Sequence, residues 1–135
     1  MSGRVQQITP EGWARGTGYA HGTAGRGRII CTAGQVGWDP GTQQFASADF
    51  APQAAQALSN VAAVLRAAGA SAEHLVRMTW FISDRQAYLD ARAAIGVAYR
   101  EHFGRHFPAM SVVVVAALLD PGALVEIEAT AIVPE

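Results

Sequence analysis

The chain has 135 residues, of which 50% are hydrophobic, and a net charge of −1. It is therefore long enough for one hydrophobic core, which predicts a single domain over residues 1–135, and it lacks the composition of a disordered protein. The basic residues are scattered and all are arginine. This pattern predicts no nucleic-acid partner, and the absence of lysine excludes Schiff-base chemistry with a carbonyl substrate or pyridoxal phosphate. We expect no cofactor.

The single cysteine, Cys31, cannot form an intrachain disulfide, which fits a reducing compartment. The first ten residues lack the apolar segment of a signal peptide, and no apolar stretch approaches the length of a membrane span. We therefore expect a soluble, cytoplasmic protein without a membrane partner. Apolar neighbours within a predicted strand favour a buried, inert thiol at Cys31.

The residue patterns predict the order β-β-α-β-α-β-β. The elements are an antiparallel hairpin over 18–23 and 28–33, a helix over 51–68, a strand over 76–83, a helix over 83–103, and strands over 110–119 and 124–133. Ser83 to Gln86 has the form of a capping box, which would begin the second helix. We expect an α+β fold with both helices on one face of a mixed sheet.

The apolar run from 112 to 117 has no polar alternation. Such a run predicts a strand that is buried on both sides, yet two helices can cover only one face of the sheet. The second face is therefore expected to lie against other copies of the chain, which predicts an oligomer.

Glu126 and Glu128 alternate with apolar residues in the last predicted strand, so both carboxylates point to the same side. One interpretation is a solvated face of an edge strand. The other places one glutamate in a cleft, where burial raises its pKa toward neutrality and suits it to proton transfer. The strand register decides which of the two faces the cleft.

His102 and His106 have a spacing that is compatible with zinc, but no third ligand is apparent. A solvated surface is the better interpretation, and we expect no metal site.

Several segments occur in an order that resembles the RidA/YjgF family of enamine and imine deaminases. They are Gly18-Tyr19, Cys31-Thr32-Ala33-Gly34-Gln35, the helix end at Ala67-Ala68-Gly69, the strand from Val76 to Asp84, Phe107-Pro108-Ala109-Met110-Ser111, and Val125-Glu126-Ile127-Glu128-Ala129. The resemblance covers nearly the whole chain. It implies a fold similar to chorismate mutase and a homotrimer with clefts between neighbouring subunits.

The resemblance also implies roles for individual residues. Glu126 is expected to be the catalytic acid/base, the backbone carbonyl of Gly34 to position water with it, and Tyr19 to line the cleft. Met110 stands where the family has an arginine that holds the substrate carboxylate. A methionine cannot form that bidentate pair. Arg105 lies five residues earlier, and the sequence gives no geometric reason for it to reach the same point.

Met110, together with Ser111 and Val112, is expected to contact the substrate. We therefore predict a hydrolase that releases ammonia from a small enamine or imine, with a specificity altered by Met110. The alternative is a trimer that binds a small metabolite in the same cleft without turnover. A ribonuclease is the least favoured class, because neither a basic patch nor a catalytic histidine pair is evident.

Overall fold

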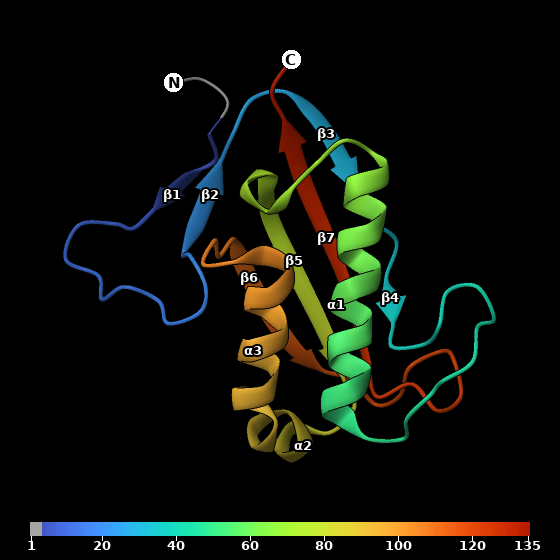
Figure 1. Cartoon of the computed structure of the whole chain (residues 1–135). Coiled ribbons are helices and arrows are strands. Elements are labelled where there is room, and N and C mark those ends of the chain that lie inside the picture. The colour runs from blue at the N-terminus through green and yellow to red at the C-terminus, as the bar shows by residue number, and fades with distance from the viewer. Residues whose placement is uncertain (1–3) are drawn as a thin grey trace.

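The computed structural model describes residues 4–135 and has an α+β architecture (Figure 1). The strands are β1 (Gln6–Ile8), β2 (Gly22–Ala24), β3 (Arg28–Cys31), β4 (Gln35–Val36), β5 (Leu75–Ile82), β6 (Ala109–Val114) and β7 (Val125–Val133); the helices are α1 (Phe50–Ala67), α2 (Arg85–Asp90) and α3 (Arg92–Phe103), and a 3-10 turn, η1, spans Ala72–His74. The main sheet has the order β3-β7-β5-β6, and β4 also pairs with β7. Strands β5 and β6 are parallel, because α2 and α3 form the crossover between them.

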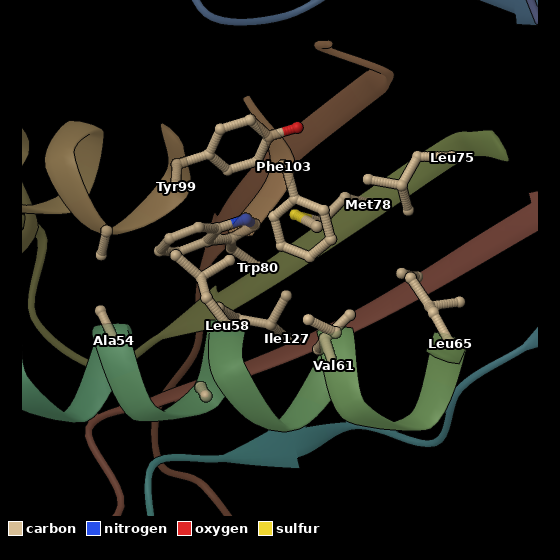
Figure 2. Close-up of a cluster of buried hydrophobic side chains, with 14 of the residues drawn as sticks. Ala54, Leu58, Val61, Leu65, Leu75, Met78, Trp80, Tyr99, Phe103 and Ile127 are labelled. Atoms are coloured by element: carbon tan, nitrogen blue, oxygen red, sulfur yellow. The ribbon is translucent and has the colours of Figure 1, made fainter. Parts of the chain in front are cut away.

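Helices α1 and α3 pack side by side on one face of the sheet, as predicted (Figure 1). The core lies between the two layers, where Leu58 of α1 and Phe103 of α3 meet Met78 and Trp80 of β5 and Ile127 of β7 (Figure 2). All five side chains are buried. The alternation of burial along β5 and β7 means that every second side chain points away from the helices, onto an uncovered face.

Buried amides on α1 attach two loops to this core. Asn60 donates to the carbonyls of Val36 and Trp38, and Gln53 donates to Gly122 while accepting from the amide of Leu124. These bonds satisfy polar groups that would otherwise be costly to bury. They therefore fix β4 and the entry to β7 against α1.

The predicted hairpin is wrong. Strand β2 pairs with β1, which the polar N-terminal segment did not predict, and β3 pairs with the C-terminal half of β7. Gly27 explains the difference: its φ is +141°, and a Cβ there would overlap the Val133 carbonyl. The chain thus turns at Gly27 and directs β3 onto β7.

The predicted second helix is interrupted. It consists of α2 and α3, which meet at Ala91, and its N-cap is Asp84 rather than Ser83. The Asp84 carboxylate accepts a hydrogen bond from the amide of Ala87 at 3.0 Å, so Asp84 provides the cap.

The apolar run from 112 to 117 is not a strand buried on both sides within a single chain. Strand β6 ends at Val114, and Val112, Val113 and Val114 are 37%, 42% and 53% exposed. The oligomer that would cover them stays a prediction.

Cys31 is exposed, so the prediction of a buried thiol is wrong. Its neighbour Ile30 enters the core, and strand alternation then turns Cys31 to the uncovered face. Among residues 4–135, no helix is both long and apolar enough to cross a membrane.

Candidate functional site

The uncovered face of the sheet carries the acidic residues that the sequence singled out. Glu126 and Glu128 of β7 both point away from the helices, as period-two alternation predicted; Glu128 is exposed, whereas Glu126 is partly buried. On β5 the pairing register places Thr79 opposite Glu128 and Phe81 opposite Glu126. A hollow of about 260 Å³ on this face is lined by Glu128 together with Arg77 and other residues, but Glu126 lies outside it.

Glu126 instead contacts Gly34, the residue before β4. A Cβ at position 34 would lie 2.8 Å from the carboxyl carbon of Glu126, closer than real Cβ contacts allow. Only glycine therefore lets the Glu126 carboxylate lie directly against the backbone of this segment. The structure thus brings together Glu126 and Gly34, which are 92 positions apart in the sequence.

The position of Gly34 is fixed on both sides along the chain. On one side, Thr32 exchanges hydrogen bonds with Ala129: its amide donates to the Ala129 carbonyl, and its hydroxyl accepts from the Ala129 amide at 3.0 Å. On the other side, Val36 is the cross-strand partner of Glu126. Gly34 is therefore held beside β7 by main-chain pairing as well as by the contact itself.

The environment of Glu126 disfavours its ionised form. Burial is the main cause that raises the pKa of Glu126 above 4.5, and the charges of Asp120 and Glu128 raise it further. A carboxyl group with a raised pKa exchanges protons more readily near neutral pH, which is the property that a general acid/base requires.

The candidate residues of β6 point to different faces. Met110 lies beside the buried Met78 and packs against the core, and Val112 lies beside Trp80. Ser111 lies beside Thr79, so strand alternation directs it to the uncovered face. Because β6 is an edge strand, a ligand could meet all three residues only along its outer edge, where their main-chain groups are also available.

Tyr19 belongs to the loop between β1 and β2, and it lies next to the start of β6. The amide of Ala20 donates to the carbonyl of Pro108 at 3.0 Å, which attaches this loop to the segment before Met110. The Tyr19 side chain is 41% exposed, and its ring makes an edge-to-face contact with His21 at 5.4 Å.

The candidate residues thus form two groups within one chain. Glu126 and Gly34 lie on one side, and Tyr19 and the β6 residues lie on the other, with β5 between β7 and β6. Met110 and Glu126 also point to opposite faces of the sheet. Met110 and Glu126 therefore do not share one face of a single chain.

The histidines do not form a metal centre. His106 donates from Nε2 to the carbonyl of Leu75 at 2.9 Å, and His102 packs beside Phe103. Within the described part of the chain, no three His, Cys, Asp or Glu side chains are grouped so that they could hold a metal ion.

The structure also has a pocket that the sequence did not predict, and its lining includes Arg15, Arg105 and Tyr19. The two arginines are 90 positions apart, and no local spacing connects them. The one feature of the sequence that could have indicated this pocket is that Arg105 lies close to the Phe107-Pro108 segment. The structure shows that Arg105 and Tyr19 line the same pocket.

Comparisons with known proteins agree with this architecture. The profile of the family described as Endoribonuclease L-PSP matches residues 13–133. The human 2-iminobutanoate/2-iminopropanoate deaminase is 36% identical over 105 residues, which are 78% of this chain and 73% of that protein. The Escherichia coli K12 protein of the same name is 38% identical over 106 residues, 78% of this chain and 80% of that protein.

Among solved structures, the Rid-family protein YyfB from Yersinia pestis, which is described as having unknown function, is similar to this chain with a TM-score of 0.83. It is 32% identical, and the match covers 96% of this chain and 99% of that one. Sequence and structure therefore agree, and the chain belongs to the RidA/YjgF family, whose profile carries the Endoribonuclease L-PSP description.

Proposed function

We propose that this protein hydrolyses a small imine or enamine to a carbonyl compound and ammonia, with Glu126 as the general acid/base. The observation that carries the proposal is the partly buried Glu126 carboxyl group, whose pKa is raised and which lies against the backbone at Gly34. The activity for which the human and E. coli relatives are named, imine deamination, supports the same reaction class.

The chemistry needs one water molecule and one group that moves protons. Protonation of the imine nitrogen makes its carbon electrophilic, and water adds to that carbon while Glu126 accepts a proton. Glu126 then returns the proton to nitrogen, the carbon–nitrogen bond breaks, and ammonia leaves while Glu126 takes the hydroxyl proton and the carbonyl forms. An enamine first takes a proton on carbon to become the imine. The main-chain carbonyl of Gly34 would orient the water beside Glu126.

Met110 is expected to influence which imine the protein accepts as a substrate. An arginine at this position would pair with a substrate carboxylate through two parallel hydrogen bonds, whereas a thioether offers a carboxylate no donor. We therefore propose a substrate that is less charged at this point, such as a neutral enamine. Met110 contacts the core on its inner side, so its outer side would present an apolar surface.

The proposal requires a second copy of the chain. Glu126 with Gly34 would come from one copy, while Tyr19 and the outer edge of β6 with Met110, Ser111 and Val112 would come from its neighbour. The exposed valines of β6 offer apolar area for such an interface. We propose that the assembly is a homotrimer.

The test is ammonia release from 2-iminobutanoate generated in situ and from a panel of neutral enamines. Glu126→Gln should lower turnover by about a hundredfold or more, the usual worth of a general acid/base. Glu128→Gln is the matched control, because it removes a carboxylate from the same face of the same strand, and it should keep most of the activity. Unchanged turnover in Glu126→Gln would exclude this mechanism.

The alternative is a binding protein that holds the same kind of metabolite without turnover. The observation that favours this alternative is that Met110 stands where the family has a carboxylate-binding arginine. A wild-type protein that binds an enamine analogue but releases no ammonia from any substrate would establish this alternative.

A further inference from the structure

A pocket of about 280 Å³ lies where the loop between β1 and β2 crosses the segment before β6. Its walls include the side chains of Arg15 and Tyr19 from the loop and of Arg105 and Phe107 from the other side. We call it the arginine pocket. Neither Glu126 nor Met110 lines it, so within one chain it shares only Tyr19 with the proposed catalytic site.

Contacts within the loop between β1 and β2 fix the side of the pocket that carries Arg15. His21 donates from Nε2 to the carbonyl of Ala14 at 2.8 Å, and Trp13 packs edge-to-face on the His21 ring at 5.1 Å. Tyr19 lies so close to Gly16 that a Cβ there would come within 2.7 Å of its ring. The loop is therefore folded back on itself, and Arg15 and Tyr19 enter the same pocket for that reason.

The opposite wall is equally fixed. Helix α3 ends at Phe103, its C-cap Gly104 has a φ of +61°, and Arg105 follows at once. Phe107 stacks on Tyr99 with 5.1 Å between ring centroids and 11° between planes, and the Tyr99 hydroxyl donates to the carbonyl of His106 at 2.6 Å. Both arginines therefore project from ordered backbone.

The charges in the pocket are unbalanced. No acidic side chain lines it, and within residues 4–135 neither Arg15 nor Arg105 forms an ion pair. Two guanidinium groups that face one cavity repel each other, and an anion between them would relieve that repulsion. Guanidinium groups match the planar geometry of a carboxylate, and the rings of Tyr19 and Phe107 offer apolar surface beside it.

We propose that the arginine pocket binds the carboxylate of a small organic acid, with Arg15 and Arg105 as a paired clamp and with Tyr19 and Phe107 against its carbon skeleton. The aromatic walls favour an organic acid over inorganic phosphate, which has no apolar part. The pocket gives the chain a carboxylate site that does not use the position of Met110.

Benzoate is a suitable probe, and benzamide is its neutral counterpart of the same shape. Titration of the full-length protein, followed by calorimetry or NMR, should show saturable benzoate binding with a Kd of about 1 mM or below and much weaker benzamide binding. Arg15→Gln and Arg105→Gln should each weaken benzoate binding about tenfold. Arg105→Lys should restore only part of the affinity, because the charge returns without the planar fork.

Arg85→Gln is the matched control, because Arg85 is an exposed arginine at the start of α2 and does not line the arginine pocket. This variant should bind benzoate like the wild type. The arginine variants leave Glu126 in place, so loss of benzoate binding in these variants and loss of turnover in Glu126→Gln are separate results, and the two proposals can fail independently. Equal affinity for benzoate and benzamide, tighter binding of phosphate than of benzoate, or equal weakening by Arg85→Gln would each overturn the proposal.

Discussion

The raised pKa of Glu126 connects the proposed chemistry to the stability of the fold. In the folded chain this group holds its proton more tightly than in the unfolded chain, where the pKa is near 4.5. Between 4.5 and the raised value the folded state binds more protons, so the free energy of unfolding falls as the pH rises through that window. Ionised Glu126 therefore destabilises the folded state at neutral pH.

Glu126→Gln removes this penalty. The variant should melt at a higher temperature than the wild type at neutral pH, and the difference should shrink toward zero as the pH falls below 4.5. Thermal melts of both proteins across this pH range test the expectation. Glu128→Gln should move the pH-dependent change in melting temperature to lower pH, because the charge of Glu128 contributes to the raised pKa of Glu126. If the difference in melting temperature between the variant and the wild type is independent of pH, the pKa of Glu126 is not raised in the folded state.

Met110 is the residue that should decide the charge of the substrate. Met110→Arg should increase kcat/KM for 2-iminobutanoate by about tenfold or more, because a guanidinium can pair with the carboxylate. The side chain is partly buried, and the long stem of arginine can follow the same apolar surface to the edge of β6. Met110→Leu is the control for repacking and should leave activity on the imino acid unchanged. A folded Met110→Arg protein without the gain would refute the specificity argument.

At the scale of elements, local patterns identified the segments that face the core. The helix predicted over 51–68 and the strand predicted over 76–83 each lie within one residue of α1 and β5, because apolar side chains repeat with the period of the element. The hairpin failed for a different reason. Gly25 and Gly27 signal a turn, but the choice of β7 as the partner of β3 is a contact between distant segments, and no local pattern encodes it.

The same distinction applies to the candidate site. The common direction of Glu126 and Glu128 follows from alternation along a strand, so the sequence predicted it. The contact between Glu126 and Gly34 came only from the family resemblance, and the pairing of Arg15 with Arg105 could not be predicted because two loops meet there. Opposite orientations of Met110 and Glu126 depend on the register of three strands, which only the fold supplies.

At the scale of the whole molecule, the proposed site would combine Glu126 of one copy of the chain with Tyr19 and the edge of β6 of another copy. If one copy supplies Glu126 and its neighbour supplies Tyr19 and the edge of β6, then a variant that is defective in one group can be complemented by a variant that is defective in the other. Glu126→Gln and Tyr19→Ala are such a pair, because these residues lie in different groups of the same chain.

The two variants should each be inactive or nearly so as homo-oligomers. After they are unfolded together in equal amounts and refolded, random assembly places an intact Glu126 opposite an intact Tyr19 in about one quarter of the interfaces, so about one quarter of wild-type activity should return. Mixing the folded proteins without exchange of subunits is the control and should return none. A site contained in one chain predicts no recovery in either case, because every chain in the mixture carries a defect, and that result would require Glu126 to work without the neighbouring edge of β6.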